Sequence, residues 1–154
     1  MLNEEEKQEI MEKLETYPVR RAGCIEALAA VQRRRGWVSD ESVRDIGALL
    51  EMTAAEVDSV ATFYNFIFRG PVGRHVVLLC DSASCWIMGC DSLIEYLKKK
   101  LDIAPGGTTR DGRYTLLPNV CLGACDEAPV MMVDDVLFGK LTPEKIDEIL
   151  ERFQ

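Results

Sequence analysis

Six cysteines are the residues of this 154-residue chain whose type and spacing could do chemistry, and four of them form two close pairs. Cys80 and Cys85 enclose four residues in CDSASC, and Cys121 and Cys125 enclose three in CLGAC. The first pair begins at the end of a predicted apolar strand, HVVLLC, and the second follows another, TLLPNV. If these strands are neighbours, both loops leave the same edge of one sheet, and four thiolates can converge there.

Four thiolates suit either zinc or an iron–sulfur cluster. Structural zinc usually prefers a tighter C-x2-C spacing, whereas each iron of a [2Fe-2S] cluster takes two thiolates and tolerates looser pairs. The residues inside both loops are small, so backbone N–H groups can approach sulfur closely, and Gly123 allows a tight turn. The spacing therefore favours a [2Fe-2S] cluster, while zinc and unliganded or disulfide-bonded thiols stay open as alternatives.

The elements that must position these cysteines begin after residue 72. The run HVVLLC predicts a strand covered on both faces, and residues 91–101 predict an amphipathic helix. An Asp-Gly turn leads into a strand at TLLP, and VMMV predicts a further strand. The segment DDVLFGKL predicts a turn and an edge strand. A last helix is predicted to begin at Thr142-Pro143-Glu144. Residues 73–154 are thus predicted to form one small domain, and the chain as a whole an α+β protein.

Residues 1–72 are predicted to form a small bundle of four helices. The signals are an Asn3 cap, an Arg-rich end before Gly36, a Ser39 cap, and a Thr53–Glu56 capping box. The fourth helix, EVDSVATFYNFIF, is apolar on more than one side. It is therefore predicted to lie at the centre of the bundle, to contact a partner protein, or both.

Composition excludes several classes of function. The net charge of −8 argues against a nucleic-acid-binding surface and against binding to anionic lipid. No apolar run approaches 18 residues and no targeting peptide is recognised, so we expect a cytoplasmic chain without direct membrane insertion. A reducing compartment favours metal or redox chemistry for grouped cysteines. No GxGxxG or P-loop occurs, so hydride transfer is not assigned to this chain.

The cysteine motifs, together with RRGWVSDE, EVDSVATFY and FRGPVGRH, resemble one family over nearly the whole chain. It is the thioredoxin-like [2Fe-2S] subunit of NADH:quinone oxidoreductase, respiratory complex I. The gamma subunits of NAD-linked hydrogenases and formate dehydrogenases share the pattern and form the alternative within this class. A zinc-stapled interaction module without a redox role is the alternative from another class.

The resemblance implies a helical N-terminal domain and a thioredoxin-like C-terminal domain. It also implies that Cys80, Cys85, Cys121 and Cys125 ligate one [2Fe-2S] cluster. In the family, a larger partner subunit binds FMN and NADH, so the chain is expected to bind that subunit and to meet the membrane through the complex. The family's cluster lies on the far side of the flavin from the main electron chain, which implies storage of an electron.

The remaining candidates have simpler interpretations. Cys24 is predicted to be a buried small apolar residue, and Cys90 a spectator outside the family motif that could become a substitute ligand or a disulfide partner. His75 is predicted to be structural. Trp86 is predicted to cover the cluster or to contact the partner, and the pair Met131-Met132 to fill the core.

Overall fold

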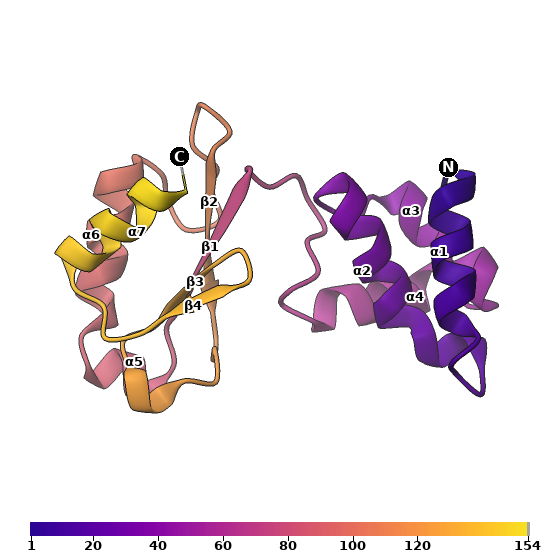
Figure 1. Cartoon of the computed structure of the whole chain (residues 1–154), viewed down its shortest axis with the longest axis horizontal. Helices are drawn as coiled ribbons and strands as arrows, with labels where there is room; N and C mark the ends of the chain where they lie inside the picture. The colour runs from indigo at the N-terminus through magenta and orange to yellow at the C-terminus, as the bar shows by residue number, and fades with distance from the viewer. Residues whose placement is uncertain (154) are drawn as a thin grey trace. The chain divides into compact units, whose positions relative to one another are not determined.

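The computed structural model describes residues 1–153 and divides into two compact units (Figure 1). The first unit is Met1–Pro71, and the second begins at Val72. Within residues 1–153, no helix is long and apolar enough to cross a bilayer. Each unit has its own apolar core.

The first unit is all helical, as the capping signals predict. Asn3 and Glu6 form a reciprocal capping box, and so do Thr53 and Glu56. The unit contains the helices α1 (Glu4–Leu14), α2 (Cys24–Arg35), α3 (Asp40–Leu50) and α4 (Ala54–Phe63), with a 3-10 turn η1 (Arg20–Gly23) before α2.

One ion pair beside the core of this bundle has a buried carboxylate and a partly exposed guanidinium. The Glu6 carboxylate, 1% exposed, accepts hydrogen bonds from the Arg35 guanidinium at 2.6 and 2.5 Å. Arg35 also donates to the Met1 carbonyl oxygen at 3.0 Å. The guanidinium hydrogen bond lowers the pKa of Glu6 below its usual value. This pair connects α1 to the C-terminal end of α2.

The predicted course of the fourth helix is wrong in its second half. Helix α4 ends at Phe63, and Tyr64 has an extended backbone. The reason lies in competing hydrogen bonds: the Gln32 amide donates to the Phe66 carbonyl at 2.7 Å and accepts from the Phe68 N–H at 2.6 Å.

These bonds leave most of the aromatic run outside the bundle. Phe63 is 77% exposed, and Tyr64 and Phe66 are also exposed, whereas Ile67 packs partly on the core. The interpretation that this helix lies at the centre of the bundle therefore holds for its first half, where Val57 and Ala61 are fully buried, and is wrong for the aromatic run. The other interpretation, contact with a partner protein, stays a prediction.

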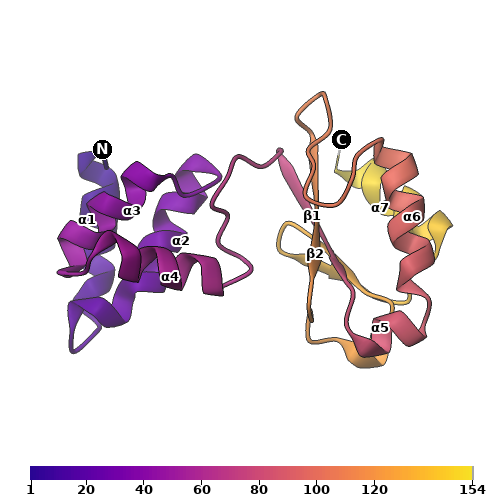
Figure 2. The same ribbon diagram turned by 180° about the vertical axis from the view of Figure 1, so that it is seen from behind.

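The second unit is a four-stranded mixed sheet with the strand order β2-β1-β3-β4. Strand β1 pairs in parallel with β2 and antiparallel with β3, and β3 pairs antiparallel with β4. Helices α6 and α7 lie side by side on one face of this sheet (Figures 1 and 2). The elements are β1 (His75–Cys80), α5 (Ala83–Ile87), α6 (Cys90–Leu101), β2 (Tyr114–Asn119), η2 (Cys125–Glu127), β3 (Met131–Val133), β4 (Val136–Phe138) and α7 (Pro143–Arg152).

The helices and the sheet enclose the main core of this unit. Alternate residues of β1, Val77 and Leu79, pack with Leu97 of α6 and Ile146 of α7. Strand β1 is buried at every residue after the half-buried His75, as expected for a strand inside the sheet. The predicted α+β fold is confirmed, and the central position of β1 fixes where its last residue lies.

Candidate metal centre

The two cysteine pairs emerge at the same end of the sheet. Strands β1 and β2 are parallel neighbours, and Cys80 at the end of β1 is in register with Asn119 at the end of β2. Cys121 follows two residues later. The predicted adjacency of the two strands is therefore confirmed. Figures 1 and 2 both show α5 and the 3-10 turn η2 together at this end of the unit.

Cys80 and Cys85 form the inner half of the site, and both side chains are buried. The Cys80 N–H donates to the Val130 carbonyl at 3.1 Å, which ties the end of β1 to the segment that enters β3. Cys85 lies in α5, a short helix within the first cysteine loop that the sequence analysis did not predict. Burial, and then the adjacent Cys80 thiol, raise the pKa of Cys85 to about 11.

Cys121 and Cys125 form the outer half, and both are exposed. Their sulfur atoms lie 3.9 Å apart, and the Gly123 N–H donates to the Cys121 sulfur at 3.4 Å. The buried Asn119 side chain donates to the Cys121 carbonyl at 3.0 Å, which anchors the loop to the end of β2. The neighbouring Cys121 thiol raises the pKa of Cys125.

Side chains of the inner half contact the outer half. The Cys80 thiol donates to the Val120 carbonyl, with sulfur and oxygen 3.8 Å apart, and Val120 directly precedes Cys121. The Ser84 hydroxyl, one residue before Cys85, hydrogen-bonds to Cys125 and opposes the rise of its pKa.

The spacing of the outer pair fits two thiolates on one metal ion. Two thiolates about 2.3 Å from a tetrahedral ion lie about 3.8 Å apart, close to the separation of Cys121 and Cys125. Within residues 1–153, no group of three or more cysteine, histidine or acidic side chains is arranged to hold a single metal ion. The structure therefore places the thiols as two pairs and not as one four-thiol group. The contacts between the pairs are the one from Cys80 to the Val120 carbonyl and the one from the Ser84 hydroxyl to Cys125.

The surface beside the outer pair is apolar. Trp86, Ile87 and Met88, at the end of α5, are exposed, and so is Val120. Trp86 alone is 62% exposed, so within this chain it does not form part of the core. A patch of large apolar side chains on the surface of a folded unit commonly marks a contact with another molecule.

Carboxylates accompany the apolar residues at this end of the unit. Asp81 and Asp126, each next to a cysteine in sequence, are exposed. Glu127 differs because it pairs with Lys140 at 3.1 Å. Negative charge beside the four cysteines disfavours the addition of an electron there.

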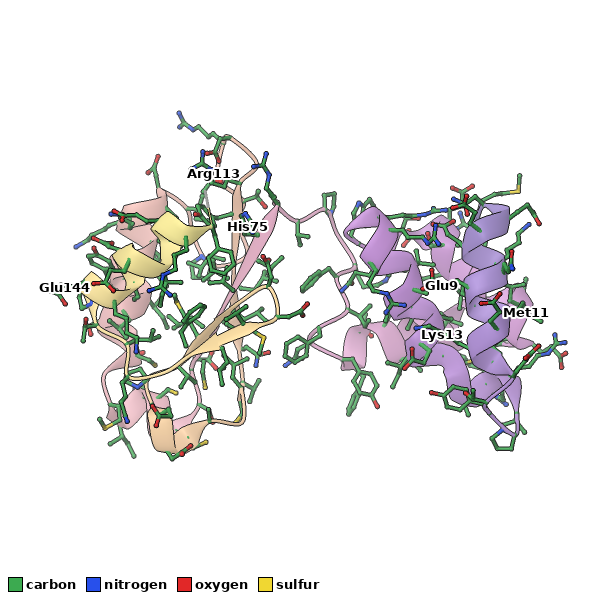
Figure 3. All side chains as sticks on the ribbon, in the orientation of Figure 1. Glu9, Met11, Lys13, His75, Arg113 and Glu144 are labelled. Atoms are coloured by element: carbon green, nitrogen blue, oxygen red, sulfur yellow. The ribbon has the colours of Figure 1, made fainter. Side chains whose placement is uncertain are left out.

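The other sequence candidates lie apart from the metal centre or outside the predicted ligand set. Cys24 is buried in the core of the first unit, as predicted. His75 pairs with Asp134 at 2.8 Å at the opposite end of β1 from Cys80, about 16 Å away at the usual rise per strand residue. Figure 3 shows His75 near Arg113, at the end of the sheet away from α5. Met131 is fully buried, as predicted, but Met132 is only partly buried.

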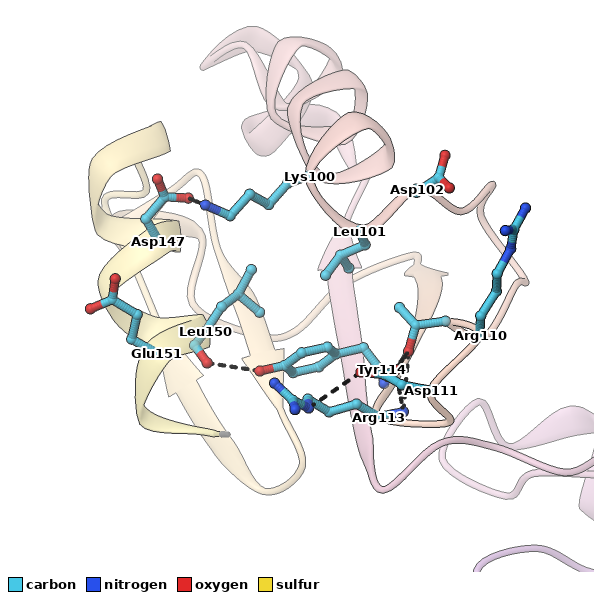
Figure 4. Close-up of a pocket in the computed structure, with 11 residues that line it drawn as sticks. Lys100, Leu101, Asp102, Arg110, Asp111, Arg113, Tyr114, Asp147, Leu150 and Glu151 are labelled. Atoms are coloured by element: carbon cyan, nitrogen blue, oxygen red, sulfur yellow. Dashed lines mark hydrogen bonds and ion pairs between the residues drawn. The ribbon is translucent and has the colours of Figure 1, made fainter.

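A cleft in the second unit is also separate from the cysteines. It has a volume of about 530 Å³ and lies between the C-terminal ends of α6 and α7 and the loop before β2 (Figure 4). Its lining carries charges of both signs, and Lys100 is paired with Asp147 at 3.1 Å. The Tyr114 hydroxyl is also occupied, since it donates to the Leu150 carbonyl at 2.7 Å.

Comparison with known proteins identifies the family. The subunit designated E of the NADH-quinone oxidoreductase of Escherichia coli (strain K12) is 49% identical over 153 residues, covering 99% of this chain and 92% of that protein. The equivalent subunit of the Pseudomonas aeruginosa enzyme is 46% identical with the same coverage.

A solved structure of an NAD⁺-reducing [NiFe]-hydrogenase in the air-oxidised state has a similar fold, with a TM-score of 0.70 and 25% identity. The match covers 86% of this chain but 23% of the hydrogenase chain, so the hydrogenase chain is much longer than the region that it shares with this chain. The model of the thioredoxin-like [2Fe-2S] ferredoxin family matches residues 10–154, which confirms the resemblance seen in the cysteine motifs. The chain therefore belongs to the thioredoxin-like [2Fe-2S] ferredoxin family.

Proposed function

We propose that this chain is the electron-transfer subunit of an NADH-quinone oxidoreductase and that Cys80, Cys85, Cys121 and Cys125 hold its [2Fe-2S] cluster. The observation that carries the ligand assignment is the parallel pairing of β1 with β2, which brings both cysteine loops to one end of the sheet. The relatives from Escherichia coli and Pseudomonas aeruginosa, alike over nearly the whole chain, support the type of complex.

The chain's own groups prepare this site for thiolate ligation. The Gly123 N–H stabilises negative charge on the Cys121 sulfur, and the Ser84 hydroxyl does so for Cys125. The buried Cys85 thiol releases its proton when it binds metal. When bound, a [2Fe-2S] cluster supplies a one-electron site. The exposed carboxylates Asp81 and Asp126 oppose the added charge, so we expect a low reduction potential of ~−400 mV or somewhat above.

We further propose that the flavin- and NADH-binding subunit of the same complex covers the apolar patch beside the outer cysteine pair. The patch adjoins Cys121 and Cys125, the two exposed members of the set, so a subunit seated there would lie close to the cluster. Hydride transfer belongs to that partner, and this chain contributes the electron site. Membrane association then comes through the complex.

The ligand assignment is tested by iron and acid-labile sulfide analysis of the anaerobically purified chain, together with EPR of the dithionite-reduced sample. We expect two iron ions and two sulfides per chain, and we expect Cys121→Ser to abolish or strongly alter the reduced-state EPR signal. Cys24→Ser is the control, because Cys24 is buried in the other unit. An unaltered signal in Cys121→Ser would remove Cys121 from the ligand set, and a colourless zinc protein would refute the cluster itself.

The partner assignment is tested by co-purification with the flavin subunit. Ile87→Ser should weaken co-purification without changing the iron content of the chain, whereas Leu137→Ser, an equally apolar exposed residue on β4, should not. Equal retention of the partner by both variants would contradict the proposed docking surface.

A further inference from the structure

A fifth cysteine lies beside the proposed ligands. Cys90 is the first residue of α6, and its exposed fraction is 0%. It belongs to the same buried cluster as Cys80 and Cys85, together with Ala128 and Val130. The inner half of the site is therefore a cluster of three thiols, of which the proposed function uses two.

Burial alone does not distinguish Cys90, because a buried cysteine commonly serves as a small apolar side chain. Cys24 is such a case: it is also buried, but the described core around it contains no other cysteine. Cys90 differs because its buried neighbours include two thiols that are proposed to bind iron. A thiolate of Cys90 would therefore lie in the same cluster of side chains as the iron that Cys80 and Cys85 are proposed to bind.

We propose that Cys90 is a reserve ligand that takes the place of Cys85 on the cluster when Cys85 does not bind. This inference rests on the proposed ligand set. In the exchange, the Cys85 sulfur leaves iron and takes up a proton, and the Cys90 thiol loses its proton and bonds to the same iron. The number of thiolates on the cluster and its electron count are unchanged, so no oxidant or reductant is needed.

The fold indicates why Cys85 is the ligand that can be replaced. Cys80 is fixed, because it ends the central strand β1 and its N–H bonds to the Val130 carbonyl at 3.1 Å. Cys85 lies in the five-residue helix α5. The two residues of α5 that follow Cys85, Trp86 and Ile87, are exposed and outside the core. Displacing α5 therefore disturbs little packing.

The position of Cys90 is close to that of Cys85 along the chain as well as in space. Only Met88 and Gly89 separate α5 from α6. Cys90 is the first residue of a twelve-residue helix that packs on the sheet, so its backbone stays in place when α5 shifts. Rotation of the Cys90 side chain about its fixed backbone would then turn its sulfur toward the iron that Cys85 leaves.

The test compares iron and sulfide content, visible absorbance and reduced-state EPR in four anaerobically reconstituted proteins: wild type, Cys85→Ala, Cys85→Ala with Cys90→Ser, and Cys85→Ala with Cys24→Ala. Alanine is used at position 85 because a serine there could itself bind iron. Serine is used at position 90 because it nearly conserves the shape of cysteine and so preserves the buried cluster. Cys24 supplies the matched control of a buried cysteine far from the ligands in the sequence.

We expect Cys85→Ala to keep most of its iron with a shifted EPR signal, and the Cys24 double variant to match it. The Cys90 double variant should hold roughly tenfold less iron or show a clearly different visible spectrum, because an alkoxide or an empty position replaces the thiolate. Loss of the cluster in Cys85→Ala alone would overturn the proposal, as would identical iron content and spectra in Cys85→Ala and its Cys90 double variant. Absence of the cluster from the wild type would instead overturn the proposed function.

Discussion

Gly123 offers a sharp test of how the backbone of the outer loop tunes the metal centre. Its φ is +80°, and its N–H donates to the Cys121 sulfur at 3.4 Å. Gly36, which ends α2 in the other unit, has the same φ of +80°. A Cβ atom added at either glycine would meet no atom within 4 Å. Gly36→Ala is therefore a control for Gly123→Ala that shares its backbone strain.

The cost of both substitutions in folding stability follows from conformation alone. An alanine in the left-handed region costs about 1–2 kcal/mol relative to ordinary backbone geometry. The less flexible unfolded chain offsets about 0.4–1 kcal/mol of this. We therefore expect each variant to lose about 0–1.6 kcal/mol in the free energy of unfolding of its own unit, and the two variants to lose similar amounts, measured by urea denaturation.

Only Gly123→Ala should change the cluster. If the loop relaxes toward negative φ, the Cys121 sulfur loses the N–H that stabilises its negative charge. A loss of about 1 kcal/mol of preferential stabilisation of the reduced state lowers a one-electron potential by roughly 40 mV. A redox titration followed by EPR measures the shift. An unchanged or higher potential in Gly123→Ala, or an equal shift in Gly36→Ala, would show that the Gly123 N–H does not tune the cluster.

Three further predictions concern the two units and their surfaces. Glu6→Gln should destabilise the first unit by about 2–3 kcal/mol in chemical denaturation, because Arg35 loses its buried counter-charge. The pKa of Glu6 is lowered in the folded state, so the stability that its carboxylate contributes is present above the ordinary pKa of 4.5 and is lost as the pH falls. The stability of Glu6→Gln should lack this loss at acidic pH. Tyr114→Phe should cost the second unit about 1–2 kcal/mol, because the Leu150 carbonyl loses a buried donor, and thermal unfolding of the variant would show it. Phe63→Ser should change the unfolding free energy by less than about 0.5 kcal/mol, and a larger loss would show that Phe63 packs in the core after all.

The parts of the structure that the sequence predicts well are those governed by local rules. The Asn3 cap of α1, the Gly36 end of α2 and the Thr142-Pro143 start of α7 all depend on a few consecutive residues. The same holds for β1, whose continuous apolar run is long enough to indicate a strand inside the sheet. The pairing of β1 with β2 is different, because it entered the sequence analysis as an assumption, from which the convergence of the two cysteine loops followed.

The parts that the sequence analysis missed depend on distant partners. Nothing in FYNFIF indicates where its helix ends, because the competing hydrogen bonds come from Gln32, more than thirty residues earlier. Helix α5 is short, and its residues are predicted from the sequence as a loop of small side chains whose backbone N–H groups approach sulfur. A helical signal was nevertheless present, because Ser82 precedes a run of residues that includes Ala83 and can start a helix.

The different exposure of the two cysteine pairs sets the direction in which an electron can enter. Cys80 and Cys85 lie under the sheet end, surrounded by apolar side chains, whereas Cys121 and Cys125 are at the surface. If the proposed ligand set holds, a docked electron donor would meet the outer pair first, and the iron held there would be the one closest to a flavin in the proposed partner. The exposed apolar residues around that pair would exclude water once the partner is seated, which strengthens every charge interaction at the site, including the effect of the Gly123 N–H. The potential in the assembled complex should therefore respond to Gly123→Ala more strongly than the potential of the isolated chain.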